Sequence, residues 1–293
     1  MATLTTMTDW LERCGPLDAL AAPVHKAVLG AARPGRWRDA VSGSWLGHPV
    51  HPFLVATPIG CWTSAHLLDL SGRSEAAQTL VGAGVLAVVP TAVTGLSDWA
   101  DTTGAEQRVG FVHLALNTAA TACYARSWWV RRRGRSGVAP AVAGGLLATA
   151  AGWLGGHLAH SLGVGVDTNA FDGGPVDWTP LEGEVRVAGD GLGSAQADGV
   201  ALVVIREDSK TRALGNRCSH RGGPLSDGRL EDGCIVCPWH ASRFDVDTGA
   251  VRQGPAVVPQ PTYETRQRGP GVEVRRAEPR SLRTNSTRPR SPG

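Results

Sequence analysis

Four stretches without any Asp, Glu, Lys or Arg follow one another in the first 166 residues: 52–68, 76–97, 109–125 and 136–166. A helix needs about 20 mostly apolar residues to cross a bilayer core of about 30 Å. In lipid, only helices and closed barrels satisfy all their backbone groups. The pattern predicts a four-span, all-α transmembrane domain over residues 48–166, in a multi-pass protein of the cell membrane. The alternative is a set of buried helices in a soluble protein, which the arginine-rich breaks between the stretches disfavour.

The character of the chain changes after these stretches. Residues 167–177 are rich in Gly and Asp and are typical of a linker. Residues 178–277 contain short β-rich runs between turn residues and predict a small all-β domain. Residues 1–47 are expected to form an N-terminal tail of cytoplasmic type, and the basic, Pro-containing residues 278–293 a disordered tail. The expected fold class is thus multidomain, an all-α membrane domain followed by an all-β domain.

The densest group of metal-binding side chains lies in the β-rich domain. Cys218-x-His220 is followed by Cys237-x-x-His240, so each short motif supplies one thiolate and one imidazole. A zinc finger instead groups its cysteines on one arm and its histidines on the other. Cys234 lies in an apolar run, and we expect it to be a packed thiol rather than a ligand.

The segments CSHRGGPL and CPWHASRFD resemble the ligand loops of the Rieske family. The resemblance implies a [2Fe–2S] cluster in which Cys218 and Cys237 bind one iron, and His220 and His240 the other. It also implies three stacked antiparallel sheets, with the cluster at the tip of two loops. A structural zinc site is the remaining alternative for these four ligands.

Other residues that match the family would surround the cluster. A third, Pro-containing loop is expected at Gly254 and Pro255. High-potential members carry an additional Cys in each ligand loop, joined as a disulfide, and use a Ser and a Tyr to hydrogen-bond the cluster sulfurs. The matching residues here are Gly223, Trp239, Ser242 and Phe244. One donor is kept and one is lost, so we expect an intermediate or low potential within the Rieske range of roughly −150 to +300 mV.

The helical half resembles a bacterial four-helix membrane domain of unknown function, DUF2231, in the segments GHPVHPFLVATPIG, SDW and GWLGGHLAH. The resemblance implies no chemistry, but ionisable residues at membrane depth are functional candidates. Alternating spans place the following candidates toward one membrane face: His51, His113, His157, His160 and Asp98. Three interpretations stay open, namely a haem or metal site, a quinone pocket, and interfacial histidines that cap helices. Gly152 and Gly156, at GxxxG spacing, are expected to allow close helix contact.

These interpretations predict a membrane-anchored Rieske protein that carries single electrons between a soluble donor or acceptor and a membrane partner, with quinone or haem as candidates. Only 53 residues follow His240 and none is His, so the chain is not expected to be an oxygenase by itself. It could donate electrons to a separate oxygenase, or act as a redox sensor. The net charge of +3 is too small to favour nucleic acid. Without the disulfide cysteines, a cytoplasmic Rieske domain is expected.

Overall fold

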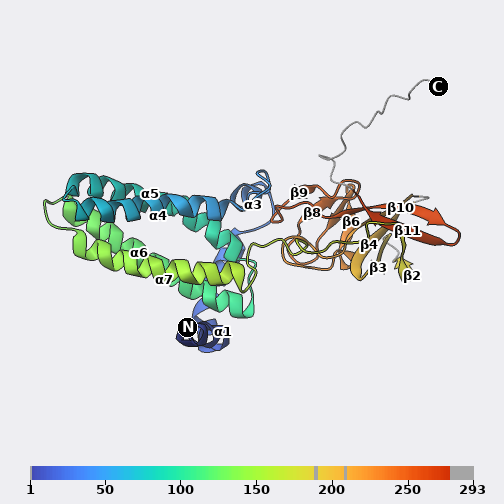
Figure 1. Cartoon of the computed structure of the whole chain (residues 1–293), viewed down its shortest axis with the longest axis horizontal. Coiled ribbons are helices and arrows are strands. Elements are labelled where there is room, and N and C mark those ends of the chain that lie inside the picture. Colours follow the sequence, from blue (N-terminus) through green and yellow to red (C-terminus); the bar gives the residue numbers. More distant parts are fainter. Residues whose placement is uncertain (1, 188–190, 208–209, 278–293) are drawn as a thin grey trace, which may run out of the picture. The chain divides into compact units, whose positions relative to one another are not determined.

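The computed structural model describes residues 2–187, 191–207 and 210–277. The chain divides into two compact units, Met1–Val166 and Asp167–Gly293. The first is helical and the second is built of β-strands, as the sequence predicts (Figure 1). The tail expected to be disordered, residues 278–293, lies outside the described residues.

Seven helices form the first unit. They are α1 Ala2–Arg13, α2 Pro16–Ala31, α3 Arg36–Ser42, α4 Val50–Leu70, α5 Ser74–Trp99, α6 Gly104–Arg131 and α7 Val138–His160. The four long helices lie side by side, α4 against α5 and α6 against α7 (Figure 1). The segment expected to be an N-terminal tail therefore contains three helices, in which Leu11 and Ala21 are buried.

Two of the four long helices in the described part of the chain are long and apolar enough to cross a membrane. These are α5 and α7, with mean hydropathy of 1.8 and 1.4. The helices α4 and α6 also run the length of the bundle, at 21 and 28 residues. The predicted four helices are thus present, and membrane-span composition is found in two of them.

Aromatic rings of neighbouring helices pack against glycines of the long helices. A Cβ atom at Gly84 would collide with the indole of Trp62, and one at Gly144 would lie 2.9 Å from the ring of Tyr124. The expected contact at Gly152 and Gly156 is different, because a Cβ atom at either position would have nothing within 4 Å. The close approaches depend on which large ring faces each glycine, and GxxxG spacing alone does not report that.

Each end of the bundle contains a buried ion pair. At one end, Arg38 of α3 contacts Asp101, and their side chains are 3% and 1% exposed. At the other end, Arg131 of α6 donates two hydrogen bonds, of 2.8 and 2.6 Å, to the carboxylate of Asp69 in α4. A buried charge without its partner is strongly destabilising, so these pairs fix how the helix ends meet.

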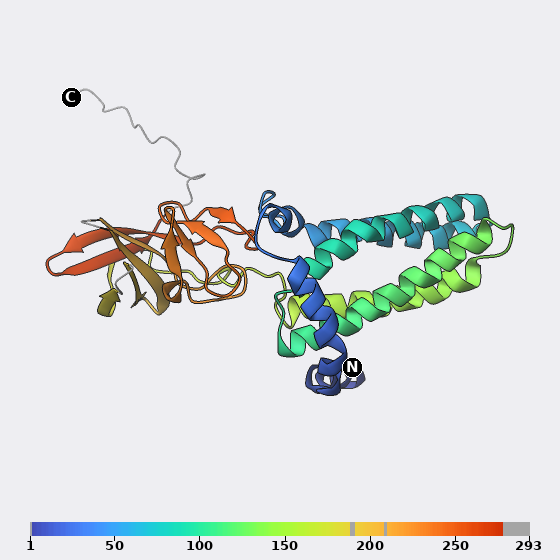
Figure 2. The ribbon, with the colours of Figure 1, turned by 180° about the vertical axis from the view of Figure 1, so that it is seen from behind.

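Eleven strands form two antiparallel sheets in the described part of the second unit (Figure 2). The larger sheet has the order β1-β11-β10-β5-β4-β3-β2 and the smaller one β6-β7-β8-β9. In the larger sheet the strands are β1 Thr179–Pro180, β2 Glu182–Val187, β3 Leu192–Ala197, β4 Val200–Glu207, β5 Lys210–Gly215, β10 Thr262–Arg268 and β11 Gly271–Arg276. In the smaller one they are β6 Arg229–Glu231, β7 Cys234–Val236, β8 Arg243–Asp245 and β9 Val251–Gln253.

The three stacked sheets that the family resemblance implies are present here as two. The reason is the pairing of β10 with β5, through Thr262 with Leu214 and Tyr263 with Ala213, which joins two strand groups into one continuous sheet. In this sheet β4 is buried on both faces. Val203 and Ile205 belong to one core and Leu202 to another, which explains the uninterrupted apolar run of β4.

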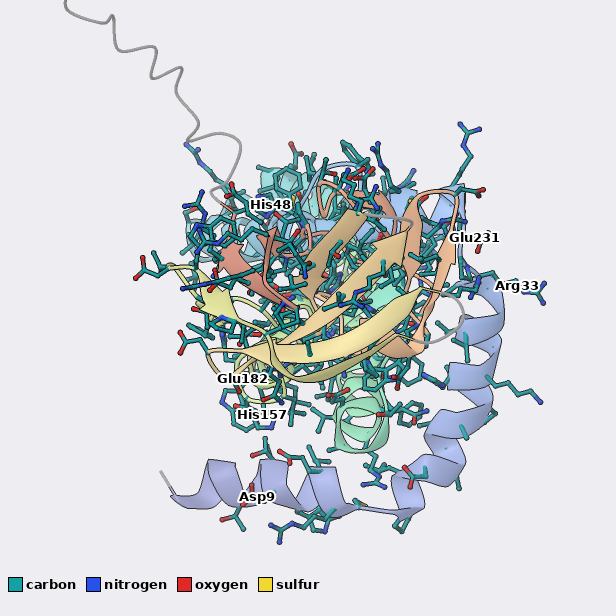
Figure 3. The ribbon with its side chains drawn as sticks, turned by 90° about the vertical axis from the view of Figure 1, so that its right-hand side faces the viewer. Asp9, Arg33, His48, His157, Glu182 and Glu231 are labelled. Carbon is teal, nitrogen blue, oxygen red and sulfur yellow. The ribbon has the colours of Figure 1, made fainter. Side chains whose placement is uncertain are left out.

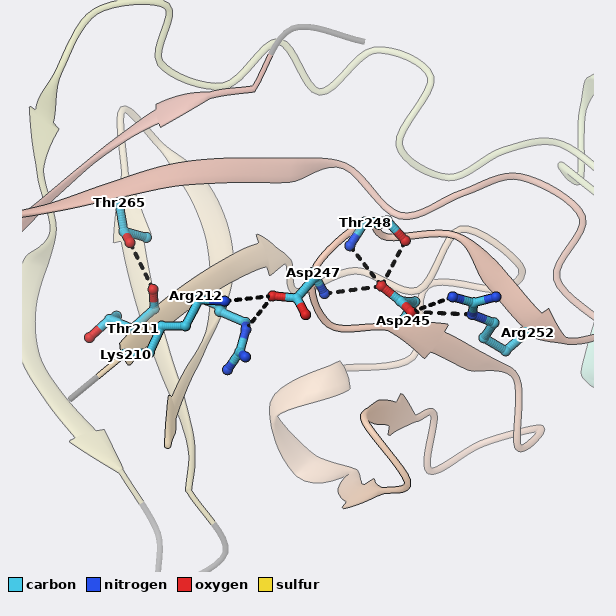
Figure 4. A network of polar contacts seen from close by, with 8 residues as sticks. All are labelled: Lys210, Thr211, Arg212, Asp245, Asp247, Thr248, Arg252 and Thr265. Atoms are coloured by element: carbon cyan, nitrogen blue, oxygen red, sulfur yellow. Dashed lines mark hydrogen bonds and ion pairs between the residues drawn. The ribbon is translucent and has the colours of Figure 1, made fainter. Parts of the chain in front are cut away.

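A turn between β8 and β9 connects the small sheet to the large one (Figure 4). The Asp245 carboxylate accepts hydrogen bonds from the backbone and hydroxyl of Thr248, at 2.9 and 2.7 Å, and from Arg252 at 2.7 Å. Asp247 accepts hydrogen bonds from Lys210 and Arg212 at the start of β5. Burial raises the pKa of Asp245, but the hydrogen bonds from Arg252 and Thr248 outweigh it and lower this pKa to about 2.

Candidate metal centre

The two Cys and His motifs lie in loops with the same backbone pattern. In the first loop the N–H of Gly222 donates to the carbonyl of Cys218, at 2.8 Å, and the N–H of Cys218 donates to Gly223, at 2.9 Å. In the second loop the N–H of Ala241 donates to Cys237, at 3.1 Å, and the N–H of Cys237 donates to Ser242, at 2.9 Å. The fourth residue after each Cys has a positive φ, 77° at Gly222 and 60° at Ala241. The loops are therefore repeats of one structure.

The two sulfur atoms of these loops face each other. Their thiols share a hydrogen bond, which raises the pKa of Cys218 and lowers the pKa of Cys237 to about 7. Backbone N–H groups also point at each sulfur, from His220 and Arg221 to Cys218, and from Trp239 and His240 to Cys237. Such donors favour the thiolate, which is the form that binds a metal.

The two imidazoles form a second pair. The ring centroids of His220 and His240 are 5.1 Å apart, with an interplanar angle of 89°. The histidine follows its Cys by two residues in the first loop and by three in the second. The loops otherwise share one backbone pattern, and with this offset the two imidazole rings lie next to each other. A pair of thiols and a pair of imidazoles in matching loops fit two metal ions with different ligands, as a [2Fe–2S] cluster requires.

No group of three or more His, Cys, Asp or Glu side chains placed around a single metal ion occurs in residues 2–187, 191–207 and 210–277. Cys234, the remaining cysteine of this region, is buried in β7 between the two loops in sequence. All six cysteines of the chain are free.

Gly223 and Trp239 connect the two loops at the positions where high-potential Rieske proteins have a disulfide. A Cβ atom at Gly223 would lie 3.0 Å from both the Trp239 ring and the Cys237 sulfur. The indole therefore packs directly on the glycine backbone, and its other side is open, since Trp239 is 57% exposed. In this chain the packing of the Trp239 ring on Gly223 joins the two loops, whereas a disulfide joins them in high-potential Rieske proteins.

Ser242 connects the second ligand loop with the third loop. The Ser242 hydroxyl accepts a hydrogen bond of 3.0 Å from the N–H of Ala256, next to the buried Gly254 and Pro255. Its own hydrogen remains available to donate. Phe244 is completely buried in the apolar core between the ligand loops and β4. This aromatic ring contributes packing and has no hydroxyl with which to donate.

One residue that sequence analysis missed has a central place in this centre. Gln260 is 2% exposed, and its side chain accepts a hydrogen bond of 3.1 Å from the N–H of Ser219 and donates to the carbonyls of Gly215 and Arg217. A polar side chain between two prolines is a signal of a fixed loop, but nothing in the sequence connects Gln260 with a loop about 40 residues earlier.

Arg243 does not offer a free positive charge near the ligands. It donates hydrogen bonds to the side chains of Glu231 and Asp232, both on the β6–β7 hairpin. Glu231 appears at the edge of the β-unit in Figure 3. These ion pairs engage the guanidinium of Arg243 within the β-unit and disfavour a role for it in docking an acidic partner.

Histidines of the helical unit contact local partners. His51 Nδ1 lies 2.9 Å from the carbonyl oxygen of Thr91, and its ring packs on Gly95. His113 Nδ1 lies 2.8 Å from the carbonyl oxygen of Ala151, and its ring packs on Gly155. In both cases an imidazole from one helix fills the space over a glycine in its neighbour.

The remaining members of the candidate haem or quinone set are placed separately. His157 Nε2 lies 2.8 Å from the carboxylate of Glu12, and Figure 3 shows His157 above α1. His160 is exposed at the end of α7, and Asp98 is half-buried near the end of α5. The structure thus gives local partners to His51, His113 and His157, which agrees with a packing role. A haem or quinone site at these residues stays a prediction.

Comparison with known proteins matches both halves of the chain. Residues 177–264 match the model of the Rieske [2Fe-2S] domain, and residues 47–168 match a family described as a predicted membrane protein, DUF2231. The chain is 33% identical over 98 residues to the ferredoxin subunit of anthranilate 1,2-dioxygenase from Burkholderia cepacia, which covers 33% of this chain and 91% of the relative. It is 35% identical over 86 residues to the ferredoxin component of the naphthalene 1,2-dioxygenase system of Pseudomonas aeruginosa, covering 29% of this chain and 82% of the relative.

Among solved structures, the ferredoxin of carbazole 1,9a-dioxygenase from Nocardioides aromaticivorans is 30% identical and covers 33% of this chain and 97% of that chain, with a TM-score of 0.31. The relatives from Burkholderia cepacia and Pseudomonas aeruginosa are matched over 91% and 82% of their own length.

Proposed function

Because this chain belongs to the Rieske [2Fe–2S] family, we propose that it is a one-electron carrier whose cluster is held by the two matching loops. Cys218 and Cys237 would bind one iron, and His220 and His240 the other. The observation that supports this assignment is the pairing of side chains: two thiols joined by a hydrogen bond, and two imidazoles 5.1 Å apart. When bound, the cluster supplies a centre that takes up and releases a single electron.

The protein side chains give this centre a protected and an open side. Both cysteines are buried, whereas His220 and His240 are half-buried and the neighbouring Trp239 is exposed. The histidine side is therefore the path by which an electron enters or leaves. The Ser242 hydroxyl can donate to a cluster sulfur and Phe244 cannot, which supports a potential below that of members with both donors.

We further propose that the helical unit anchors the carrier in a cell membrane as a multi-pass domain. The family match of residues 47–168 and the composition of α5 and α7 support this proposal. None of the six cysteines is joined in a disulfide, which suits a reducing compartment, so we place the Rieske domain on the cytoplasmic side.

The relatives indicate the class of redox partner. Both are ferredoxin components of dioxygenase systems, which supports electron transfer from this chain to a separate oxygenase or another soluble redox protein. A quinone in the membrane is the second candidate partner, because a membrane-anchored carrier could exchange electrons with it.

Electron counting tests the proposal. The purified full-length protein is titrated anaerobically with dithionite while its visible absorbance is recorded, and iron and zinc are measured on the same sample. We expect two irons and one accepted electron per chain, returned on addition of a one-electron oxidant. A chain that contains zinc and accepts no electron would overturn the proposal. A reducible cluster that changes partner association without passing electrons would replace the carrier by a sensor.

A further inference from the structure

The segment that follows the last helix is fastened to the first ligand loop. The Thr168 hydroxyl donates a hydrogen bond of 2.8 Å to the carbonyl of Cys218, and the Asn169 amide donates one of 2.8 Å to the carbonyl of Arg217. The backbone N–H of Thr168 lies 3.4 Å from the carbonyl of Ser219. Three consecutive carbonyls of the ligand loop are thus contacted by two consecutive residues, which we call the clasp.

Both peptide units next to Cys218 are held at each end. The Arg217–Cys218 unit accepts from Asn169 and from Gln260 at its carbonyl, and its N–H donates to Gly223. The Cys218–Ser219 unit accepts from Thr168 at its carbonyl, and its N–H donates to the side-chain oxygen of Gln260. The backbone around this cysteine therefore has little freedom to rotate.

Asn169 of the clasp is buried and Thr168 is half-buried, and the loop atoms that they contact are buried, so these polar atoms depend on each other for hydrogen bonds. Asn169 is 4% exposed, and Ser219 and Gln260 are 3% and 2% exposed. A buried carbonyl that loses its donor keeps the cost of leaving water and loses the bond that offsets it. Asn169 is matched by neither family model, and Thr168 lies outside the Rieske match, which begins at residue 177. The clasp is therefore an addition to the Rieske domain in this chain.

We propose that Thr168 and Asn169 are positioning residues for the cluster: they fix the backbone of Cys218 and thereby set how firmly the iron is held and at what potential it is reduced. The proposal rests on the assignment of Cys218 as a ligand. Donors to the carbonyls beside a ligand reduce the negative charge that faces a reduced cluster, so their removal lowers the potential. A backbone free to rotate also widens the range of ligand geometries.

The test compares variants of the full-length protein with its cluster. Thr168→Val removes the hydroxyl and keeps the shape of the side chain, and Thr168→Ser restores the donor. Thr179→Val is the matched control, because the Thr179 hydroxyl donates only to the nearby carbonyl of Asp177 and is exposed. Asn169→Ser is a second variant of the clasp, used if Thr168→Val fails to fold.

Three properties are measured: the rate at which a chelator removes iron, the potential from an EPR-monitored titration, and deuterium exchange of residues 216–222. For Thr168→Val we expect iron removal about five- to tenfold faster, the factor that loss of one hydrogen bond produces. We also expect broader EPR lines, a lower potential and faster exchange, with Thr168→Ser and Thr179→Val close to the wild type.

The results separate this proposal from the assignment on which it rests. Equal iron removal, potential and exchange in Thr168→Val, Asn169→Ser and Thr179→Val, with a normal cluster in all, would overturn the clasp and leave the cluster assignment intact. A wild-type protein without a reducible cluster would overturn the ligand assignment itself.

Discussion

Histidines in the two units of this molecule are placed in different ways. In the β-unit, His220 and His240 come from two loops with one backbone pattern, and their ring centroids are 5.1 Å apart with nearly perpendicular planes. In the helical unit, His51 and His113 each contact a backbone carbonyl of the neighbouring helix and pack on a glycine. The first arrangement brings imidazoles from two separate loops together, and the second uses imidazoles to join neighbouring helices. The residue type is the same, and only the surroundings distinguish the proposed metal ligands from the histidines that pack between helices.

The largest expected effect separates these two kinds of histidine. Replacing Cys218 or His240 by Ala removes a ligand, and we expect complete loss of the visible spectrum and of bound iron. Replacing His113 by Ala leaves a gap over Gly155 and frees the carbonyl of Ala151, so the helical unit loses stability while the iron content stays at two per chain. Iron analysis and visible absorbance measure both. Loss of a haem spectrum in His113→Ala would contradict the packing role of His113 and identify it as a haem ligand.

Substitutions of two glycines test the difference between a glycine that a ring packs on and a glycine with open space around it. Gly223→Ala places a methyl group 3.0 Å from the Cys237 sulfur and the Trp239 ring, so the two ligand loops must separate. We expect iron loss to a chelator to be about tenfold faster, the equivalent of about 1.4 kcal/mol of overpacking. The control is Gly152→Ala in α7, where a Cβ atom meets nothing within 4 Å. This control should be neutral or stabilising, and equal iron loss in both variants would contradict the packing described for Trp239.

The third prediction concerns how the stability of the fold depends on pH through Asp245, in the turn that follows the second ligand loop. Because the pKa of Asp245 is about 2 in the folded protein and its ordinary value is 3.8, the carboxylate stabilises the fold at pH above about 4. This contribution is lost as the pH falls from about 4 to 2. At pH 7, Asp245→Asn should reduce the free energy of unfolding by about 1–2 kcal/mol, measured by urea unfolding.

The Asp245→Asn variant should also lose less stability than the wild type between pH 4 and pH 2. Asp247→Asn is the comparison variant: hydrogen bonds from Arg212 and Lys210 also lower the pKa of Asp247, but this side chain is more exposed, so we expect a smaller loss of stability. Parallel pH profiles for Asp245→Asn and wild type would show that the Thr248 and Arg252 contacts do not stabilise the turn.

The smallest expected effect is a change of potential without loss of the cluster. Phe244→Tyr adds a hydroxyl near the site, and a hydrogen bond to the cluster would raise the potential by about 40 mV, the one-electron equivalent of about 1 kcal/mol. Ser242→Ala should lower it by a similar amount. An EPR-monitored titration measures both shifts. Opposite signs would show that these side chains do not act as donors to the cluster.

Spacing along the chain predicted the ligand loops because their geometry is local. Each Cys and its His are separated by one or two residues, and the turn between them is closed by hydrogen bonds inside the same loop. The β-rich runs likewise predicted the all-β unit. The number of sheets was not predictable, since it depends on two residue pairs that join β5 to β10 across about 50 residues.

Contacts that join distant parts of the chain were outside the reach of sequence patterns. Gln260 and Asn169 both contact the Arg217 carbonyl, from positions that lie after and before it by more than 40 residues. In the helices, the alternation of directions predicts which histidines lie toward the same membrane face, but this prediction does not reveal whether a ring faces a glycine or an open pocket. The GxxxG spacing of Gly152 and Gly156 had the same weakness.

The central claim is that two cysteines and two histidines hold one [2Fe–2S] cluster, and low-temperature EPR of the dithionite-reduced full-length protein tests it most directly. The account predicts a rhombic signal with an average g value below that of the free electron, and couplings to two histidine nitrogens in the pulsed experiment, both lost in His240→Ala. A protein that gives no signal and contains one zinc per chain would contradict the account, because the four side chains would then be a structural zinc site.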